Sequence, residues 1–307
     1  MLKTAKIRVA CLMNTSYAGS TMMTLLMDSH PQIASVGEGI NRRIFVKNPE
    51  AYSCSCGEVL IRCAFWKQVA QCVNDQGIDF QIQDLSLGYK YQNTVLRRLL
   101  HTYFSHPKLG PLYADLSSLL PVHAARIKKI GRVNVAFIRT ALNLTGADVF
   151  FSASKNLMGH HHLLALPELE VKFIRMVRDV RSFASSYKLK GKTVPEAIKV
   201  WRNYQLCADY LMQTLPQPDV ILVRYEDLCR QPDYWLETIH RFLDVEVRRL
   251  PDVFIPKEHH ITGNKLRLQP QLTVQPIERW KTILTDDEID LTLRLAGHIN
   301  RRFGYDA

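Results

Sequence analysis

Residues 7–28 read IRVACLMNTSYAGSTMMTLLMD, and this stretch organises the rest of the chain. The apolar run 7–13 has the length and composition of a strand that is buried on both faces. The apolar-rich run 21–27 suits a buried helix, and the short loop 14–20 between them is polar. The sequence therefore predicts a strand, a tight loop of small residues and a helix, in that order.

The loop between this strand and this helix has the residue types of an anion site. The first turn of a helix has unpaired N–H donors and carries the positive end of the helix dipole. Gly19 lets the backbone approach a ligand closely, and the hydroxyls of Ser20 and Thr21 add donors. We expect a phosphate or sulfate cradle; a strand-to-helix joint that binds no ligand is the alternative. The ATPase phosphate-loop pattern is not met, because Ser20 stands where that pattern has Lys.

The composition indicates a globular protein with a basic surface. Of the 307 residues, 47% are hydrophobic, and the formal net charge is +11. Lys and Arg are scattered along the chain, which favours a small anionic ligand over a nucleic-acid surface. The apolar run after Lys6 is too short for a signal peptide, and no run approaches the ~18 apolar residues that span a bilayer. We therefore expect a soluble cytoplasmic protein with no nucleic-acid or membrane partner; its oligomeric state stays open.

Four of the seven cysteines lie close together in the sequence, at Cys54, Cys56, Cys63 and Cys72. The lack of a secretory signal argues against a disulfide framework. Their spacing, C-x-C-x6-C-x8-C, matches no common zinc template, so a metal cluster is the weaker interpretation. We expect reduced, partly buried thiols and no metal site.

Strand-like apolar runs alternate with helical patterns along the rest of the chain. The runs lie at 33–36, 148–151, 171–177 and 220–224, and the helical patterns at about 157–165, 180–188 and 195–214. This alternation predicts an α/β fold with a parallel sheet that is covered by helices. No linker or repeat interrupts residues 1–307, which we interpret as one domain.

Two further regions complete the predicted domain. Residues 41–147 are interpreted as a largely helical insertion that caps the crevice, with helices near 93–103 and 133–143. A terminal surface helix is expected to begin at Thr285, which forms a capping box with Glu288.

Two polar side chains follow predicted strands, at the edge where ligands bind in open α/β sheets. Glu38 follows the second strand and can therefore face the same crevice as the glycine loop. Arg178 follows the strand at 171–177, and its planar guanidinium can donate two parallel hydrogen bonds to a phosphate. Ser186 lies eight residues later, where it can share that phosphate. A structural charge at Arg178, paired with Asp179, is the alternative.

Six segments, taken in chain order, resemble the sulfotransferase superfamily whose donor is 3′-phosphoadenosine-5′-phosphosulfate (PAPS). They are AGSTMMTLLMDSHP…VGE (18–38), SASK (152–155), VKFIRMVRDVRSFASSY (171–187), VRYEDLCRQP (223–232), HHITGNKLR (259–267) and ERWKTILT (278–285). CSCG at 54–57 and CAFW at 63–66 are similar to a stretch of the bacterial and carbohydrate-type branches. The resemblance implies a P-loop-like three-layer fold, with a central parallel sheet flanked by helices and a helical cap over the acceptor.

The resemblance also implies roles for individual positions. The residues that correspond to the donor-binding positions of the family are Tyr17, Ala18, Gly19, Ser20, Thr21, Arg178, Ser186 and Arg267. Lys155 corresponds to a lysine near the transferred sulfuryl group. The segment 224–227 is interpreted as support for the fold. Trp280 and Lys281 match a WK pair, and whether Trp280 belongs to the site or to the core is open.

Two positions depart from the family pattern. Tyr17 stands where the family has Arg or Lys, so the loop brings no positive charge to the bridging oxygen of the donor. Lys155 or a nearby Arg must then supply that charge, or catalysis is slow or altered. Leu157 stands where the cytosolic branch has a catalytic His.

The general base is left open among three candidates. Sulfuryl transfer is expected to pass through a loose in-line transition state, in which positioning and charge stabilisation dominate and no metal is needed. A base must take the proton of the acceptor. Glu38, which matches an acidic residue of some bacterial members, is the first candidate, and His259 or His260 is the second. The row 160–162 is the third, with a surface cluster at a helix start as its alternative.

We therefore expect a PAPS-dependent sulfotransferase that acts on a hydroxyl or amine of a small-molecule acceptor and leaves 3′-phosphoadenosine-5′-phosphate (PAP). The missing export signal argues against a Golgi-type glycan enzyme and for a soluble acceptor, such as a bacterial secondary metabolite or a lipid-like molecule. A nucleotide-binding protein with weak catalysis and a P-loop kinase are the alternatives.

Overall fold

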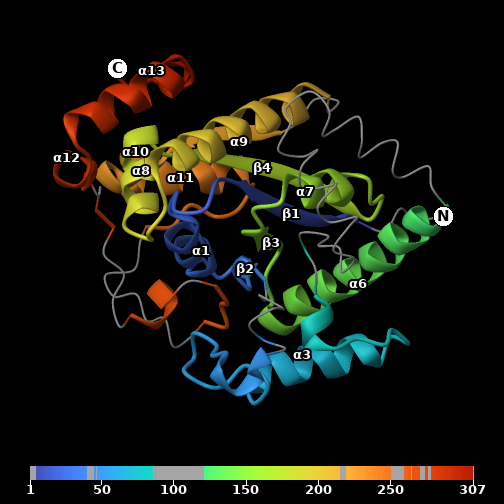
Figure 1. Cartoon of the computed structure of the whole chain (residues 1–307). Helices are drawn as coiled ribbons and strands as arrows, with labels where there is room; N and C mark the ends of the chain where they lie inside the picture. The colour runs from blue at the N-terminus through green and yellow to red at the C-terminus, as the bar shows by residue number, and fades with distance from the viewer. Residues whose placement is uncertain are drawn as a thin grey trace.

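The computed structural model describes residues 5–39, 45, 47–85, 87, 121–214, 219–249, 259–263, 265–269, 274–275 and 278–306. Its centre is a sheet of five parallel strands in the order β2-β3-β1-β4-β5 (Figure 1). Their bounds are β1 Ile7–Met13, β2 Ile33–Ser35, β3 Val149–Ser152, β4 Leu169–Val177 and β5 Val220–Arg224. The predicted parallel sheet is confirmed, and β1 and β5 begin and end at the expected residues.

Helices cover both faces of this sheet. Their bounds are α1 Ser20–Asp28, α3 Ala64–Asn74, α6 Pro121–Thr145, α7 Leu157–Leu164, α8 Val180–Lys188, α9 Val194–Thr214, α10 Tyr225–Arg230, α11 Pro232–Phe242, α12 Trp280–Ile283 and α13 Asp286–Arg302. The expected helices at 157–165, 180–188 and 195–214 correspond to α7, α8 and α9. At the start of α13 the Thr285–Glu288 capping box is formed as predicted. In the part of the chain that is described, no helix has the length and apolar character needed to cross a bilayer.

The side chains of β1 alternate between two apolar cores, which makes the domain three-layered. Val9, Cys11 and Met13 pack in a core with the aromatic side chains of α3 and α6, among them Trp66 and Phe137. Ala10 and Leu12 pack on the opposite face in a second core, with residues of α1, α10 and α11. The run is apolar throughout because neither face of the central strand meets water.

The insertion predicted at 41–147 is described only in part. Its described helices are α3 and α6, and α6 contains the helix expected near 133–143. The helix expected near 93–103 lies outside the described residues. Whether 1–307 forms a single domain stays a prediction.

Candidate functional site

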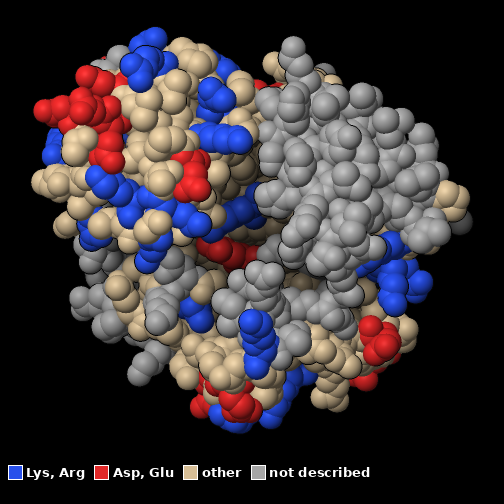
Figure 2. Space-filling model, viewed as in Figure 1, with Lys and Arg blue, Asp and Glu red and all other residues tan. Residues whose placement is uncertain are grey.

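The predicted site residues follow the carboxyl ends of four strands. The glycine loop follows β1, Glu38 follows β2, Lys155 follows β3 and Arg178 follows β4. Because the strands are parallel, these ends share one edge of the sheet, where α/β proteins bind ligands. In Figure 2, Lys and Arg side chains gather around the position that α8 and the start of α1 occupy in Figure 1, beside a hollow in the surface. The topology thus brings cationic and polar groups to one place.

The backbone of the glycine loop has the form of an anion cradle. Gly19 is the N-cap of α1, with a φ of 87° in the left-handed region, and Tyr17 has a φ of 62°. Glycine has no side chain with which to cap the first turn, so the N–H groups there remain available to a ligand. Tyr17 has a β-carbon, so its left-handed backbone costs on the order of 1 kcal/mol, a strain that is typical of functional loops.

Replacing Gly19 with alanine should destabilise the protein and disturb this loop. A β-carbon on Gly19 would lie 2.5 Å from Cδ2 of Tyr225, and the φ of 87° already disfavours an L side chain. Gly77 is the matched control, because its φ is 74° and nothing lies within 4 Å of the added carbon. We expect Gly19→Ala to lower the free energy of unfolding by about 1–3 kcal/mol more than Gly77→Ala, measured by urea denaturation. Equal losses in the two variants would show that Tyr225 does not restrict the loop.

Three predicted residues from three segments meet beside this loop. Oε1 of Glu38 accepts a hydrogen bond from Oγ of Ser20 at 2.8 Å and forms an ion pair with Nζ of Lys155 at 2.7 Å. The side chains of Glu38 and Lys155 are each 25% exposed, so both are partly desolvated but open to a ligand. A carboxylate, an ammonium and a hydroxyl at the N-terminus of a helix can together bind an anion and accept a proton.

Arg178 is on the other side of the glycine loop. Its Nη1 donates to the carbonyl oxygen of Tyr17 at 2.7 Å and to Oγ of Ser186 at 3.3 Å, as the eight-residue spacing predicted. Its guanidinium also lies over the ring of Tyr225, 4.7 Å from the ring centre. Asp179 instead pairs with Arg181, at 2.6 Å. Arg178 is thus oriented by the loop, α8 and an aromatic ring.

Tyr225 is a site residue that the sequence analysis did not single out. Its ring lies against the position of Gly19 and under the guanidinium of Arg178. It directly follows β5, which places it at the same edge of the sheet as the other site residues. That strand-end position was the available signal, since the segment 224–227 was interpreted only as support for the fold. Glu226 does have such a role, because the hydroxyl of Tyr305 donates to it at 2.5 Å.

The sequence matches a family that transfers sulfuryl groups. The model described as "Sulfotransferase family" matches residues 16–249, which is well over half of the 307 residues. The chain belongs to the sulfotransferase family. Membership of this family implies a sulfuryl donor and an acceptor substrate.

Known sulfotransferases resemble the chain at low identity. Carbohydrate sulfotransferase 1 of Danio rerio is 25% identical over 173 residues, which cover 47% of this chain and 40% of that protein, so the match spans less than half of either. The sulfotransferase domain from the curacin biosynthetic pathway has a TM-score of 0.48 and 15% identity, covering 96% of this chain and 98% of that one. Sulfotransferase STF9 from Mycobacterium avium has a TM-score of 0.47 and 12% identity, covering 98% and 78%.

The late segment passes beside the residues that precede Glu38, where the hydroxyl of Thr262 donates to the carbonyl of Val36. Arg267 is 5% exposed and donates to the carbonyl oxygens of Gly263 and Ser53. Nδ1 of His259 lies 2.6 Å from Oδ2 of Asp28, at the far end of α1 from the glycine loop. Arg267 therefore joins the segment that contains Ser53 to the segment that contains Gly263. Its contact with a nucleotide stays a prediction.

The other candidate histidines and Trp280 of the WK pair contact parts of the fold away from the glycine loop. His260 directs Nδ1 at the sulfurs of Cys54 and Cys63. His160 is fully buried on α7, and burial lowers its pKa to about 4. The alternative of a surface cluster at 160–162 is wrong for His160 and His162, which are 0% and 3% exposed. The ring of His160 packs edge-on against Phe173 of β4. Trp280 lies under the guanidinium of Arg181, 4.4 Å from it, and packs with the core of α8, α9 and α13.

Proposed function

We propose that this sulfotransferase transfers the sulfuryl group of PAPS to a hydroxyl or amine of a small-molecule acceptor. The observation that supports this most is the meeting of Ser20, Glu38 and Lys155 beside an uncapped helix N-terminus, with Arg178 on the other side of the same loop. PAPS has a phosphosulfate at its 5′ end and a separate phosphate on its 3′ oxygen, so it requires two distinct anion sites. A net charge of +11 is consistent with such a donor.

Each of these residues has a role in the proposed reaction. The N–H groups of the loop and the hydroxyls of Ser20 and Thr21 bind the 5′-phosphosulfate, and Arg178 and Ser186 bind the 3′-phosphate. The bond between sulfur and the bridging oxygen breaks as the acceptor oxygen or nitrogen bonds to sulfur. Lys155 stabilises the charge that develops on the leaving phosphate. Glu38 takes the proton of the acceptor, and PAP leaves.

Lys155 is the residue that can replace the cation missing at position 17. The ring of Tyr17 packs edge-on against Tyr187 on α8, with the ring centres 5.4 Å apart, so this side chain contacts the helix. Lys155 is already held next to Ser20 by its ion pair with Glu38. When a sulfuryl group is bound there, the ammonium can shift to it over a short distance and release Glu38 to act as a base.

A nucleotide-binding protein with weak catalysis is the second candidate. The observation that favours it is the neutral Tyr17 in the loop, together with a base that is ion-paired in this structure. The two candidates differ in turnover and agree on donor binding.

Transfer of radiolabelled sulfate from PAPS to a panel of phenols, alcohols and amines separates the candidates. We expect labelled product with at least one acceptor class, and PAP binding by calorimetry that exceeds ATP binding. PAP binding without any labelled product would support the weak catalyst. ATP binding in preference to PAP would contradict both candidates and favour a kinase.

A further inference from the structure

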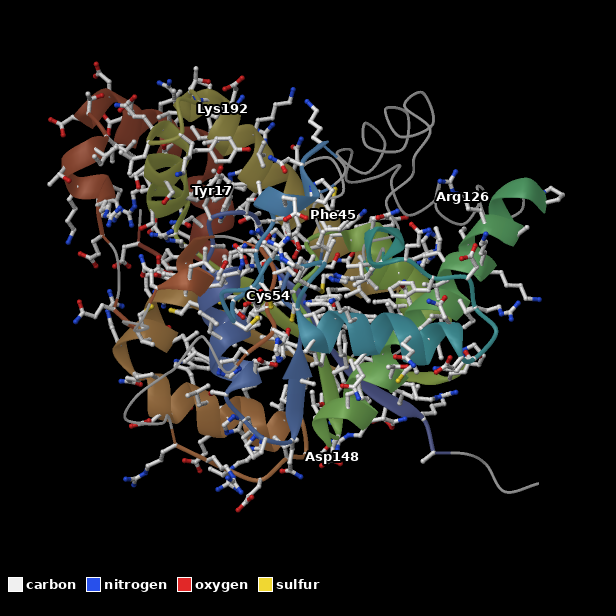
Figure 3. All side chains as sticks on the ribbon, turned by 90° about the horizontal axis from the view of Figure 1, so that it is seen from below. Tyr17, Phe45, Cys54, Arg126, Asp148 and Lys192 are labelled. Carbon is white, nitrogen blue, oxygen red and sulfur yellow. The ribbon has the colours of Figure 1, made fainter. Side chains whose placement is uncertain are left out.

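Three cysteines and one histidine converge outside the proposed transfer site. The sulfurs of Cys54, Cys56 and Cys63 and a ring nitrogen of His260 all lie within 4.8 Å of one another. Cys54 lies near the centre of the molecule in Figure 3, close to one end of α3, and Cys63 is the N-cap of that helix. His260 comes from a segment 197 residues later than Cys63. The fold thus completes a set of ligands that the spacing of the cysteines alone does not show.

Three of the six ligand-to-ligand distances in this cluster are close to those of a tetrahedral zinc shell, and all six are within 4.8 Å. With Zn–S bonds of about 2.3 Å and Zn–N bonds of about 2.0 Å, tetrahedral ligands lie about 3.8 Å apart for two sulfurs and about 3.5 Å apart for sulfur and nitrogen. The sulfurs of Cys56 and Cys63 are 3.7 Å apart. Nδ1 of His260 is 3.4 Å from the sulfur of Cys63 and 3.7 Å from that of Cys54.

The surroundings of the cluster orient these four ligands. The imidazole of His260 stacks on the ring of Phe65, with the planes at 1° and the centres 4.6 Å apart, which fixes the direction of Nδ1. Gly57 has a φ of 96°, and its N–H donates to the carbonyl of Cys54, so the chain turns sharply around the first two cysteines. Cys54 and Cys63 are buried, at 0% and 1% exposed. Outer contacts of this kind hold metal ligands in place.

We propose that Cys54, Cys56, Cys63 and His260 bind one zinc ion. A ligand set of three sulfurs and one imidazole selects zinc over the harder cations, which prefer oxygen ligands. The protein supplies all four ligands, so no coordination position is open to water or substrate. The site is therefore structural and does not take part in sulfuryl transfer.

The proposed zinc ion joins the segment 54–63 to the segment 259–263, which passes beside the residues that precede Glu38. Between the two segments, the N–H of Ser55 donates to the carbonyl of Ile261 and the N–H of Ile261 donates to Oγ of Ser55. The next residue, Thr262, donates its N–H and its hydroxyl to the carbonyl of Val36, two residues before Glu38. A metal at His260 thus restrains the strand-like segment that sets the position of the proposed base.

Metal analysis of the untagged full-length protein tests the proposal. We expect one zinc per chain by inductively coupled plasma mass spectrometry, and a tetrahedral Co²⁺–thiolate absorption spectrum after cobalt replaces it. Cys56→Ser should lower zinc affinity more than about 100-fold, since even outer-shell substitutions cost about 10- to 100-fold. Cys56 is partly exposed, whereas Cys54 and Cys63 are buried, so a serine at position 56 disturbs the packing least and this variant is expected to fold. Cys72→Ser is the matched control and should retain full zinc content, because Cys72 is outside the cluster.

Three results would overturn the proposal. The first is wild-type protein with free thiols that takes up neither zinc nor cobalt. The second is a disulfide between two of the clustered cysteines in the freshly purified protein. The third is equal loss of zinc from Cys56→Ser and Cys72→Ser, which would place the metal elsewhere. None of these results depends on the identity of the sulfuryl donor, so the zinc proposal can fail while the proposed function stands.

Discussion

Replacing Arg178 with alanine should weaken PAP binding by about 100-fold or more, measured by calorimetry. Removing one partner of a desolvated, hydrogen-bonded charge pair costs about 2–5 kcal/mol, and each 1.4 kcal/mol is about tenfold in affinity. The guanidinium of Arg178 is held by the carbonyl of Tyr17, Oγ of Ser186 and the ring of Tyr225, so it is positioned before the ligand arrives. A pre-positioned group loses little entropy on binding, and the whole charge interaction is then available to the 3′-phosphate.

Two further variants separate this role from a structural one. Arg178→Lys keeps the charge but loses the planar fork, so it should fall between wild type and alanine. Arg241→Ala removes an exposed arginine that pairs with Glu237 on α11, and it should leave affinity unchanged. Because Arg178 also packs on Tyr225, the thermal midpoint of each variant is measured alongside. Wild-type affinity for PAP in a folded Arg178→Ala variant would remove the 3′-phosphate assignment.

Most of the fold could be predicted from the sequence, because the parallel sheet is buried on both faces. Ile7–Met13 and Val220–Arg224 are apolar runs bounded by polar residues, and they became β1 and β5 at those bounds. The segment 225–242 was not predicted to be helical, although it forms α10 and α11. Its charged residues alternate closely with apolar ones, and only its first part, within 223–232, was interpreted, as a segment that resembles the family. Pro232, at the first turn of α11, is the signal in the sequence that marks the start of this helix.

The candidate site could be placed from the sequence to the extent that strand ends determine it. The carboxyl ends of parallel strands share an edge, so Glu38 and Arg178 were expected near the loop from their positions alone. Lys155 was expected there only from the resemblance to the family. The ion pair between Glu38 and Lys155 could not be foreseen, because it depends on the directions of two side chains 117 residues apart. The same holds for His260, which was expected as a possible base and instead faces the cysteine sulfurs.

Replacing Glu38 with glutamine should lower kcat by about 10²- to 10⁴-fold, the usual contribution of a general base, while PAP affinity changes little. The amide oxygen of glutamine can still accept from Ser20 and Lys155, as Oε1 of Glu38 does at 2.8 and 2.7 Å, so the loop keeps its geometry. The substitution removes the ability to take a proton and the negative charge that pairs with Lys155, while the hydrogen-bond acceptor is kept. Labelled-sulfate turnover and PAP calorimetry on the same preparation measure both quantities.

The matched control for this variant is Glu58→Gln, which changes an exposed side chain between Cys56 and Cys63. It makes the same chemical change on an exposed side chain that contacts neither Ser20 nor Lys155, and it should retain wild-type turnover. His259→Asn tests the rival base, and it should also retain turnover because His259 pairs with Asp28 at the far end of α1. Full turnover in Glu38→Gln together with a large loss of turnover in His259→Asn would show that His259 is the general base. A combined loss of PAP affinity and turnover in Glu38→Gln would instead show that Glu38 acts by holding Lys155 and the donor loop in place.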